Sequence, residues 1–161
     1  MIVVSDTSAL INLAAVGQLD LLRQLYGNVL IPTAVRAEIL SGGPGAPGVL
    51  AVTTLPWVET RTATNALLIG ALRQQLDAGE AEAIALASET KADLLLLDER
   101  HARQVAANLG VKVAGLIGVL LEAKHRRLLP AVKPVLDALI RQAGFWISHT
   151  LYNRTLQVAG E

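Results

Sequence analysis

The sequence predicts an α/β fold in which a parallel sheet is covered by helices on both faces. Short runs such as Leu94–Leu97 are apolar at every position, which is typical of strands buried on both sides. Segments with helical periodicity lie between these runs. Regular alternation of the two kinds of segment is typical of parallel strands joined by crossover helices, so we expect an α/β sandwich.

Five segments are expected to form the strands of this sheet. Each is short and rich in Val, Ile or Leu, and the third has the weakest pattern. They are Ile2–Ser5, Val29–Ile31, Trp57–Thr60, Leu94–Leu97 and Lys112–Ala114.

The periodic segments between and after these strands are expected to be helices. From about residue 115 onward only helices are expected, and Pro130 and Ser148 introduce two of them at positions that favour helix starts. The expected helices are 9–15, 20–25, 32–40, 63–75, 79–89, 99–108, 116–124, 131–143 and 149–158.

Length and composition indicate one cytoplasmic domain, residues 1–161. The chain is long enough to bury a core, and it has no Cys, which excludes disulfides and thiolate metal sites. No secretory signal is expected at its start. No apolar run approaches the roughly 18 residues that span a bilayer, so no membrane partner is expected.

The charge balance argues against a dedicated nucleic-acid binder with a strongly basic face. The chain has 14 basic and 14 acidic residues. RNA held locally remains compatible, because basic residues gather at Arg100–Arg103 and Lys124–Arg127. A solvated helix end explains the second cluster at least as well.

One segment, Ser41–Gly48, is expected to be irregular. It contains four Gly and two Pro in eight residues. A plain connector is preferred over a lid that gates a substrate.

Asp6 and Asp98 each follow an apolar run at a predicted strand-to-helix junction. Asp is a preferred N-cap residue, so each carboxylate has a structural explanation as well as a catalytic one. Both acids, however, stand at the carboxyl ends of parallel strands, where open α/β sheets bind ligands. Their shared location favours a functional role for the pair.

Glu38 lies within the apolar arc of its predicted helix. At about 100° per residue it falls between Ala34 and Val35 on the arc that continues to Ile39. Buried charges are paired or bind metal, so the alternatives are an ion pair with a distant Arg and a metal site.

Glu80 is placed by the same geometry at the centre of an apolar face, with Glu82 and Glu89 projecting to the opposite side. Asp77 followed by Glu80 is also the signature of a capping box. A cap explains the spacing but not the inward direction, which favours a functional Glu80. Clustered carboxylates repel one another, so this set predicts a bound cation.

Four segments of the chain combine the acids described above with their neighbouring apolar residues: Val4–Leu10, Ile31–Leu40, Gly79–Ala87 and Leu95–Arg100. Together they resemble the PIN-domain nuclease superfamily. The resemblance covers most of the chain and is nearest to a PIN-like branch related to the VapC toxins of bacterial and archaeal toxin–antitoxin modules. It implies a three-layer α/β/α sandwich with a parallel five-stranded sheet in the order 3-2-1-4-5.

The same resemblance implies a set of acids that hold Mg²⁺ or Mn²⁺ for RNA cleavage. Glu80 stands where the common toxin pattern has Asp, and Leu96–Leu97 replaces a polar Thr-x before the last acid. Glu99 is a candidate to compensate as a further ligand, and Ser8 matches a hydroxyl that supports the first acid. By motif position the acids are Asp6, Glu38, Glu80 and Asp98.

The expected function is therefore a metal-dependent endoribonuclease, the toxin of a toxin–antitoxin module. Arg100 and Arg103 are candidates for holding substrate phosphates, although a solvated helix face explains Arg103 equally well. The rival class is a non-catalytic PIN-like module that binds RNA or a protein. Expected partners are an RNA substrate, a small antitoxin protein and a second copy of the chain.

Overall fold

The computed structural model describes residues 1–161 and contains one parallel sheet in the order β3-β2-β1-β4-β5. All four neighbouring strand pairs are parallel. The predicted fold class and strand order are confirmed. The strands are β1 (Val3–Ser5), β2 (Val29–Pro32), β3 (Val58–Arg61), β4 (Leu94–Leu96) and β5 (Val113–Ala114).

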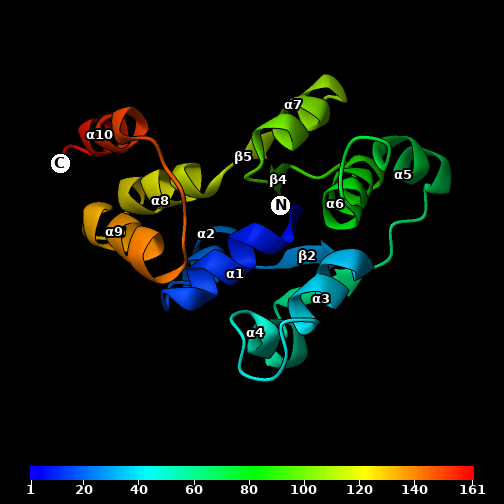
Figure 1. Cartoon of the computed structure of the whole chain (residues 1–161), viewed down its shortest axis with the longest axis horizontal. Coiled ribbons are helices and arrows are strands. Elements are labelled where there is room, and N and C mark those ends of the chain that lie inside the picture. Colours follow the sequence, from blue (N-terminus) through cyan, green and yellow to red (C-terminus); the bar gives the residue numbers. More distant parts are fainter.

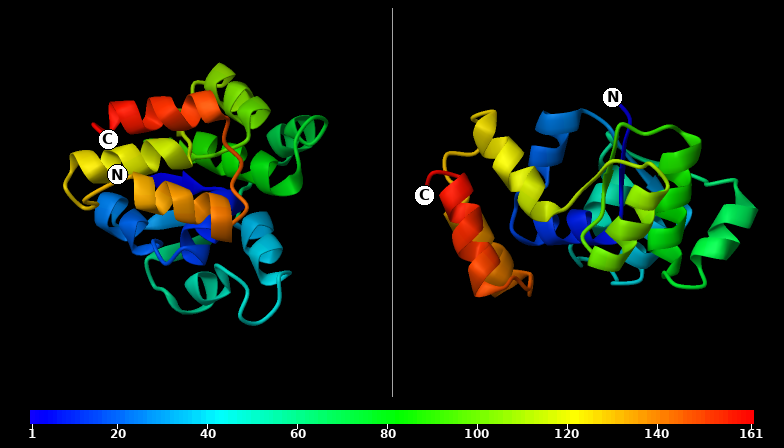
Figure 2. Two further views of the ribbon diagram at one scale, coloured as in Figure 1. Left: turned by 60° about the vertical axis from the view of Figure 1, so that its left-hand side comes forward. Right: turned by 90° about the horizontal axis from the view of Figure 1, so that it is seen from above.

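Helices cover both faces of the sheet, as Figures 1 and 2 show. One face is packed by α1 (Thr7–Ala15), α2 (Asp20–Tyr26), α3 (Thr33–Leu40), α4 (Val49–Thr54), α8 (Leu116–His125) and α9 (Lys133–Gln142). The other face is packed by α5 (Ala66–Leu72), α6 (Ala78–Glu89) and α7 (Arg100–Asn108). The last helix, α10 (His149–Val158), packs beside α8.

The core is divided in two by the sheet because successive strand residues point to opposite faces. Val3 belongs to the larger apolar cluster and Val4 to the smaller one. Leu96 and Leu97 divide in the same way, and all four side chains are at most 1% exposed. Burial on both faces explains why these runs show no alternation in the sequence.

The largest differences from the predicted elements are in the first half of the chain. The six-residue helix α4 was not predicted, because it is too short to show periodicity; it buries Ala51 and Val52. The helix predicted over 63–75 spans only Ala66–Leu72, where Asn65 caps its first turn through Leu68 N–H. The segment 41–48 forms turns that lead into α4.

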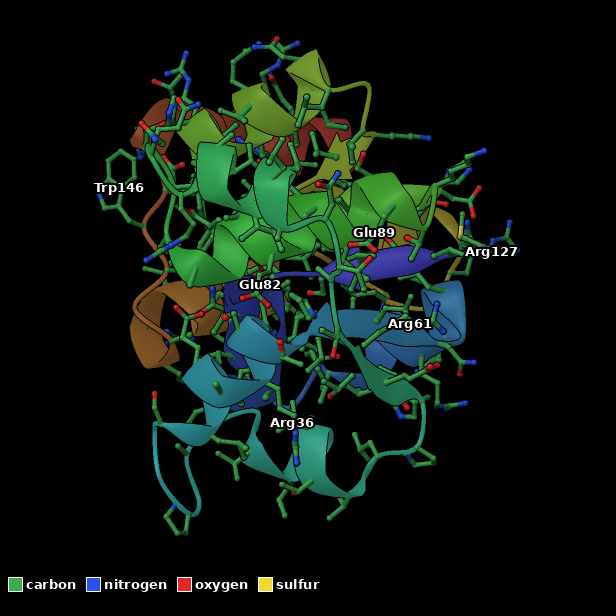
Figure 3. The ribbon with its side chains drawn as sticks, turned by 90° about the vertical axis from the view of Figure 1, so that its right-hand side faces the viewer. Arg36, Arg61, Glu82, Glu89, Arg127 and Trp146 are labelled. Carbon is green, nitrogen blue, oxygen red and sulfur yellow. The ribbon has the colours of Figure 1, made fainter.

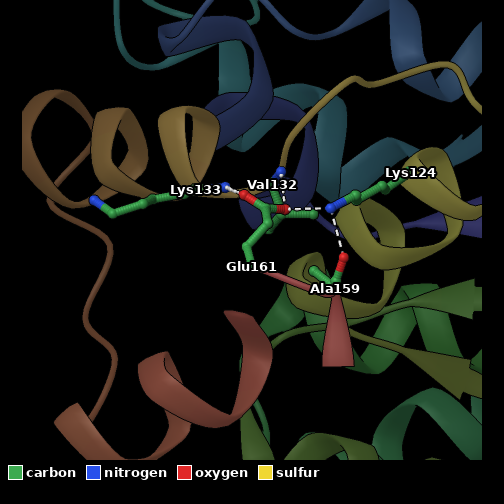
Figure 4. Close-up of polar contacts among 5 residues, drawn as sticks. All are labelled: Lys124, Val132, Lys133, Ala159 and Glu161. Atoms are coloured by element: carbon green, nitrogen blue, oxygen red, sulfur yellow. Dashed lines mark hydrogen bonds and ion pairs between the residues drawn. The ribbon is translucent and has the colours of Figure 1, made fainter. Parts of the chain in front are cut away.

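The carboxylate of Glu161 joins the C-terminal end of the chain to the helical part after residue 115, as Figure 4 shows. Glu161 accepts hydrogen bonds from the backbone N–H groups of Val132 at 2.7 Å and Lys133 at 3.0 Å. It also pairs with Lys124 Nζ at 2.8 Å. Lys124 is therefore engaged within the protein. None of the helices has the length and apolar character needed to cross a membrane.

Candidate functional site

A small cavity at the carboxyl edge of the sheet is lined only by non-hydrophobic residues. Its volume is about 280 Å³, and it lies where β1 meets α1 and where α3 approaches α6. Three of the four acids singled out in the sequence line it. The lining residues are Asp6, Thr7, Ser8, Glu38, Asp77, Gly79, Glu80 and Glu99.

Asp6 is the most deeply buried acid of this cavity, with 5% of its surface exposed. It is both N-cap and cavity lining, because its Oδ1 accepts the Ala9 N–H at 3.1 Å. Burial, with smaller contributions from the negative charges of Asp98 and Glu80, raises the pKa of the Asp6 carboxyl to about 7. The two explanations of Asp6 are therefore compatible, and its carboxylate carries charge that no cation of the protein neutralises.

Glu38 reaches the cavity from α3, but its side chain is exposed and not enclosed in the apolar arc as predicted. Only Val35 and Ile39 of α3 are buried, so the apolar arc is narrower than the helical wheel suggested. The Thr7 hydroxyl donates to Glu38 Oε2. A Cβ at Gly79 would lie 3.0 Å from that same oxygen, so glycine leaves room for the carboxylate at this wall.

Glu80 belongs to the capping box and to the cavity at once. Asp77 Oδ1 accepts the Glu80 N–H at 2.8 Å, and Glu80 Oε1 accepts the Asp77 N–H at 3.2 Å. The side chain is half-buried, and desolvation raises the pKa of the Glu80 carboxyl, as do the charges of Asp77 and Glu99. The cap holds Glu80 at the helix start, which is also where the cavity lies.

Glu82 corrects the helical-wheel prediction, because it does not project away into solvent. It is half-buried between α6 and α3, as Figure 3 shows, and its Oε1 accepts from Thr33 Oγ1 and from the Ala34 N–H, both at 3.1 Å. Helix α6 is buried around most of its circumference, so it has no single outward face. Glu82 lines no part of the acidic cavity.

Asp98 does not line the acidic cavity; it faces the cavity beside it. Its Oδ1 accepts the Leu116 N–H at 2.8 Å, at the start of α8, and Ser8 Oγ is 3.5 Å from Oδ2. Asp98 is not the cap of α7. Glu99 has that role, accepting from His101 N–H at 3.1 Å and Ala102 N–H at 2.7 Å.

The neighbouring cavity is larger, about 1280 Å³, and has a different lining. It shares Ser8 and Glu99 with the acidic cavity and extends to Arg100, Arg103 and Trp146. The sequence pointed to the two arginines but not to Trp146. The signal that would have found it is the scarcity of aromatic residues, one Phe, two Trp and two Tyr in the whole chain.

The donor set of the acidic cavity suits a divalent cation. Carboxylate and hydroxyl oxygens are the ligands that Mg²⁺ and Mn²⁺ prefer. In the present side-chain positions no three acidic residues are arranged to hold one ion, because Glu80 and Glu38 bond to protein donors. The chemistry fits a cation, and rotation of these two side chains would free their oxygens for it.

Comparisons with known proteins agree with this fold. Residues 2–161 match a family model described as PIN domain. A PilT N-terminus domain protein from the hyperthermophilic archaeon Sulfolobus solfataricus P2 has a similar structure, with a TM-score of 0.52 and 17% sequence identity over 92% of this chain and 99% of that chain. No curated protein matches the chain. The PIN domain is generally a nuclease fold whose members typically use divalent metals. Because the match extends over nearly its whole length, this chain belongs to the PIN-domain family.

Proposed function

We propose that this protein is a metal-dependent endoribonuclease that hydrolyses RNA phosphodiester bonds. The observation that supports this proposal most strongly is the all-polar cavity around Asp6, where Glu38, Glu80 and Glu99 add further carboxylates. No Lys or Arg lines this cavity, and burial together with neighbouring acids raises the pKa of Asp6 to about 7. A bound cation supplies the missing positive charge most directly.

The protein groups have separable tasks in such a reaction. Asp6, Glu38 and Glu80 would hold the metal, and Thr7 and Ser8 would position the carboxylates that they contact. Bound Mg²⁺ or Mn²⁺ activates water and stabilises charge on the scissile phosphate. No side-chain nucleophile is required. Asp98 would act from the neighbouring wall, where its charge already affects Asp6.

We also propose the biological setting in which such a nuclease would act. The order of the acidic motifs resembles that of VapC-related toxins, which supports a toxin role with a small antitoxin protein as partner. The neutral net charge of the chain fits a nuclease that holds RNA at a local site and not over a broad basic face. A second copy of the chain is the other proposed partner.

A non-catalytic PIN module is the second candidate, and one observation favours it. Three acids are already engaged by protein donors: Glu38 by Thr7, Glu80 by the Asp77 N–H, and Asp98 by the Leu116 N–H. Acids that serve only as caps and tethers would look like this. The two candidates differ in whether a metal displaces these bonds.

RNA cleavage by the purified protein, with Mn²⁺ or Mg²⁺ and with EDTA, tests the proposal. Asn caps a helix about as well as Asp, so Asp6→Asn should fold while losing at least about 100-fold in cleavage rate. Glu59→Gln is the matched control, because Glu59 is exposed on β3 and pairs only with Arg61. Metal-independent cleavage, or equal loss in both variants, would contradict the metal site.

A further inference from the structure

The larger cavity combines an exposed aromatic ring with two unpaired guanidinium groups. Trp146 is 83% exposed and lines this cavity together with Arg100 and Arg103. Neither arginine takes part in any of the ion pairs of the protein. Arg103 is half-buried, and its Nη1 lies against the backbone of Gly115, where a Cβ would be 2.6 Å away. These cations are therefore available to a ligand.

Trp146 is held outward by residues on either side of it. The segment between α9 and α10 is not helical, and its Phe145 and Ile147 are half-buried against the larger core cluster. The Phe145 N–H also donates to the Leu139 carbonyl at 3.0 Å. The ring of Trp146 projects from the surface in Figure 3. The backbone on either side of Trp146 is anchored, which keeps the point of attachment of the ring at the cavity wall.

The two cavities adjoin, which suits a ligand long enough to occupy both. Ser8 and Glu99 line both of them. The larger cavity, about 1280 Å³, exceeds the roughly 300–1,000 Å³ of most small-molecule sites. A strand with one phosphate at the acidic cavity would continue past Arg103 toward Trp146. Guanidinium groups bind phosphates, and exposed aromatic rings stack on unpaired bases.

We propose that Trp146 is a stacking platform for an unpaired base of the nucleic-acid strand that enters the acidic cavity, with Arg103 and Arg100 holding the adjoining phosphates. This subsite rests on the proposed nuclease function and defines which part of a strand the enzyme grips. An acidic peptide would also suit the arginines. The exposed ring of Trp146 favours the nucleic acid, because an unpaired base can stack on it and an acidic side chain cannot.

Tryptophan fluorescence tests the subsite directly. In a Trp57→Phe protein, Trp146 is the sole Trp, and a short single-stranded RNA in EDTA at low salt should quench its emission with saturation. The same RNA as a duplex, or inorganic polyphosphate, should leave the emission unchanged because neither presents an unpaired base. If Trp57→Phe fails to fold, the difference between wild type and Trp146→Phe gives the same signal.

Binding and kinetics of substituted proteins complete the test. Trp146→Ala should weaken RNA binding about tenfold and raise KM while leaving kcat unchanged, and Trp146→Phe should recover most of the affinity. Leu67→Ala is the matched control, since Leu67 is 88% exposed on α5 and lines neither cavity. Wild-type affinity in Trp146→Ala would overturn the subsite.

The outcomes separate this subsite from the proposed activity. Titration in EDTA needs no cleavage, so quenching in a protein that cleaves no RNA would reject the nuclease and retain the stacking platform. Cleavage with unquenched Trp146 would reject the platform and retain the nuclease. Quenching by an acidic peptide in place of RNA would overturn the proposal in favour of a protein partner.

Discussion

The two adjoining cavities have opposite chemistry and are built by different parts of the chain. The acidic cavity has no hydrophobic residue in its lining, and its acids come from α3, α6 and the residues after β1 and β4. The larger cavity has 10 hydrophobic residues among 21 and is completed by α8 and the segment before α10. The strand ends and helices before residue 100 thus supply the acids, whereas the part of the chain after residue 115 supplies the ring and much of the apolar wall.

This difference implies that the proposed metal site and the proposed base-stacking subsite can change independently. Any fold with this strand order brings the ends of β1 and β4 together, because the two strands are neighbours in the sheet. Trp146 depends on how α9 and α10 pack, which the sheet does not dictate. Asp98 connects the two regions: it faces the larger cavity, yet its charge raises the pKa of Asp6.

The largest expected effect is the pH dependence of stability caused by Asp6. The pKa of Asp6 is about 7 in the folded protein, against 3.8 for an unperturbed Asp, chiefly because the side chain is buried. The folded state therefore binds this proton more tightly than the unfolded chain. Without metal, ionisation of the buried Asp6 carboxyl destabilises the folded state. This destabilisation is absent below about pH 4 and grows to about 4 kcal/mol above pH 7, so the free energy of unfolding falls as the pH rises.

Urea unfolding in EDTA between pH 4 and pH 8 measures this slope. Asp6→Asn should remove most of it, and Mn²⁺ should flatten it in the wild type by neutralising the carboxylate. Glu59→Gln should keep the wild-type slope. A slope that survives in Asp6→Asn would mean that another group carries the pH dependence and that the acidic cavity is not under electrostatic strain.

A smaller pair of effects should separate the acids of α6. Glu80→Gln keeps the capping box, because Gln also serves at that position, but weakens the metal site. Glu82→Ala removes hydrogen bonds to Thr33 Oγ1 and the Ala34 N–H and should cost about 1–3 kcal/mol of stability.

Thermal unfolding with and without Mn²⁺ distinguishes the two roles. A metal at a hundred times its dissociation constant stabilises the folded state by about 2.7 kcal/mol. Without metal, Glu82→Ala should be less stable than the wild type, but Mn²⁺ should still stabilise it by the full increment. Glu80→Gln should be nearly as stable as the wild type without metal, but should lose much of the stabilisation by Mn²⁺. Loss of the increment in Glu82→Ala as well would place Glu82 in the metal site.

The contrast between Glu80 and Glu82 also shows what the sequence could predict. Strand ends follow from uninterrupted apolar runs, and the strand order was implied by the resemblance to PIN domains, so the location of Asp6 was predictable. Glu82 was misjudged because a helical wheel assumes one apolar face, whereas Ala81, Ala83 and Ala85 are all buried in α6. Small side chains allow neighbours to pack on several sides, which periodicity does not reveal.

Trp146 and Asp98 illustrate a second limit, since their surroundings depend on packing between distant segments. Nothing local indicates that Asp98 accepts from the Leu116 N–H and faces the larger cavity. The scarcity of aromatic residues marks Trp146 as unusual, but its place in the same cavity as Arg103 depends on how α8 and α10 pack. Sequence patterns identify candidate residues more readily than they assign them to one of two adjacent cavities.

The smallest expected effect is that of Gly115→Ala, in the wall of the larger cavity that also contains Arg103. The backbone of Gly115 is extended, with φ −92° and ψ −179°, so alanine is allowed there. A Cβ would lie 2.6 Å from Arg103 Nη1 and 3.0 Å from Asp98 Oδ1, and the flexible arginine should move away. Gly115→Ala should therefore weaken RNA binding a few-fold and make the dependence of log K on log salt shallower by about 0.7, the value for one lost phosphate contact on a single strand.

Arg103→Gln should give the same change, and the double variant no more than either alone. Gly70→Ala, with nothing within 4 Å of the added Cβ, is the control. An unchanged salt slope in Gly115→Ala would show that Arg103 holds no phosphate, leaving base stacking on Trp146 as the larger cavity's main contribution.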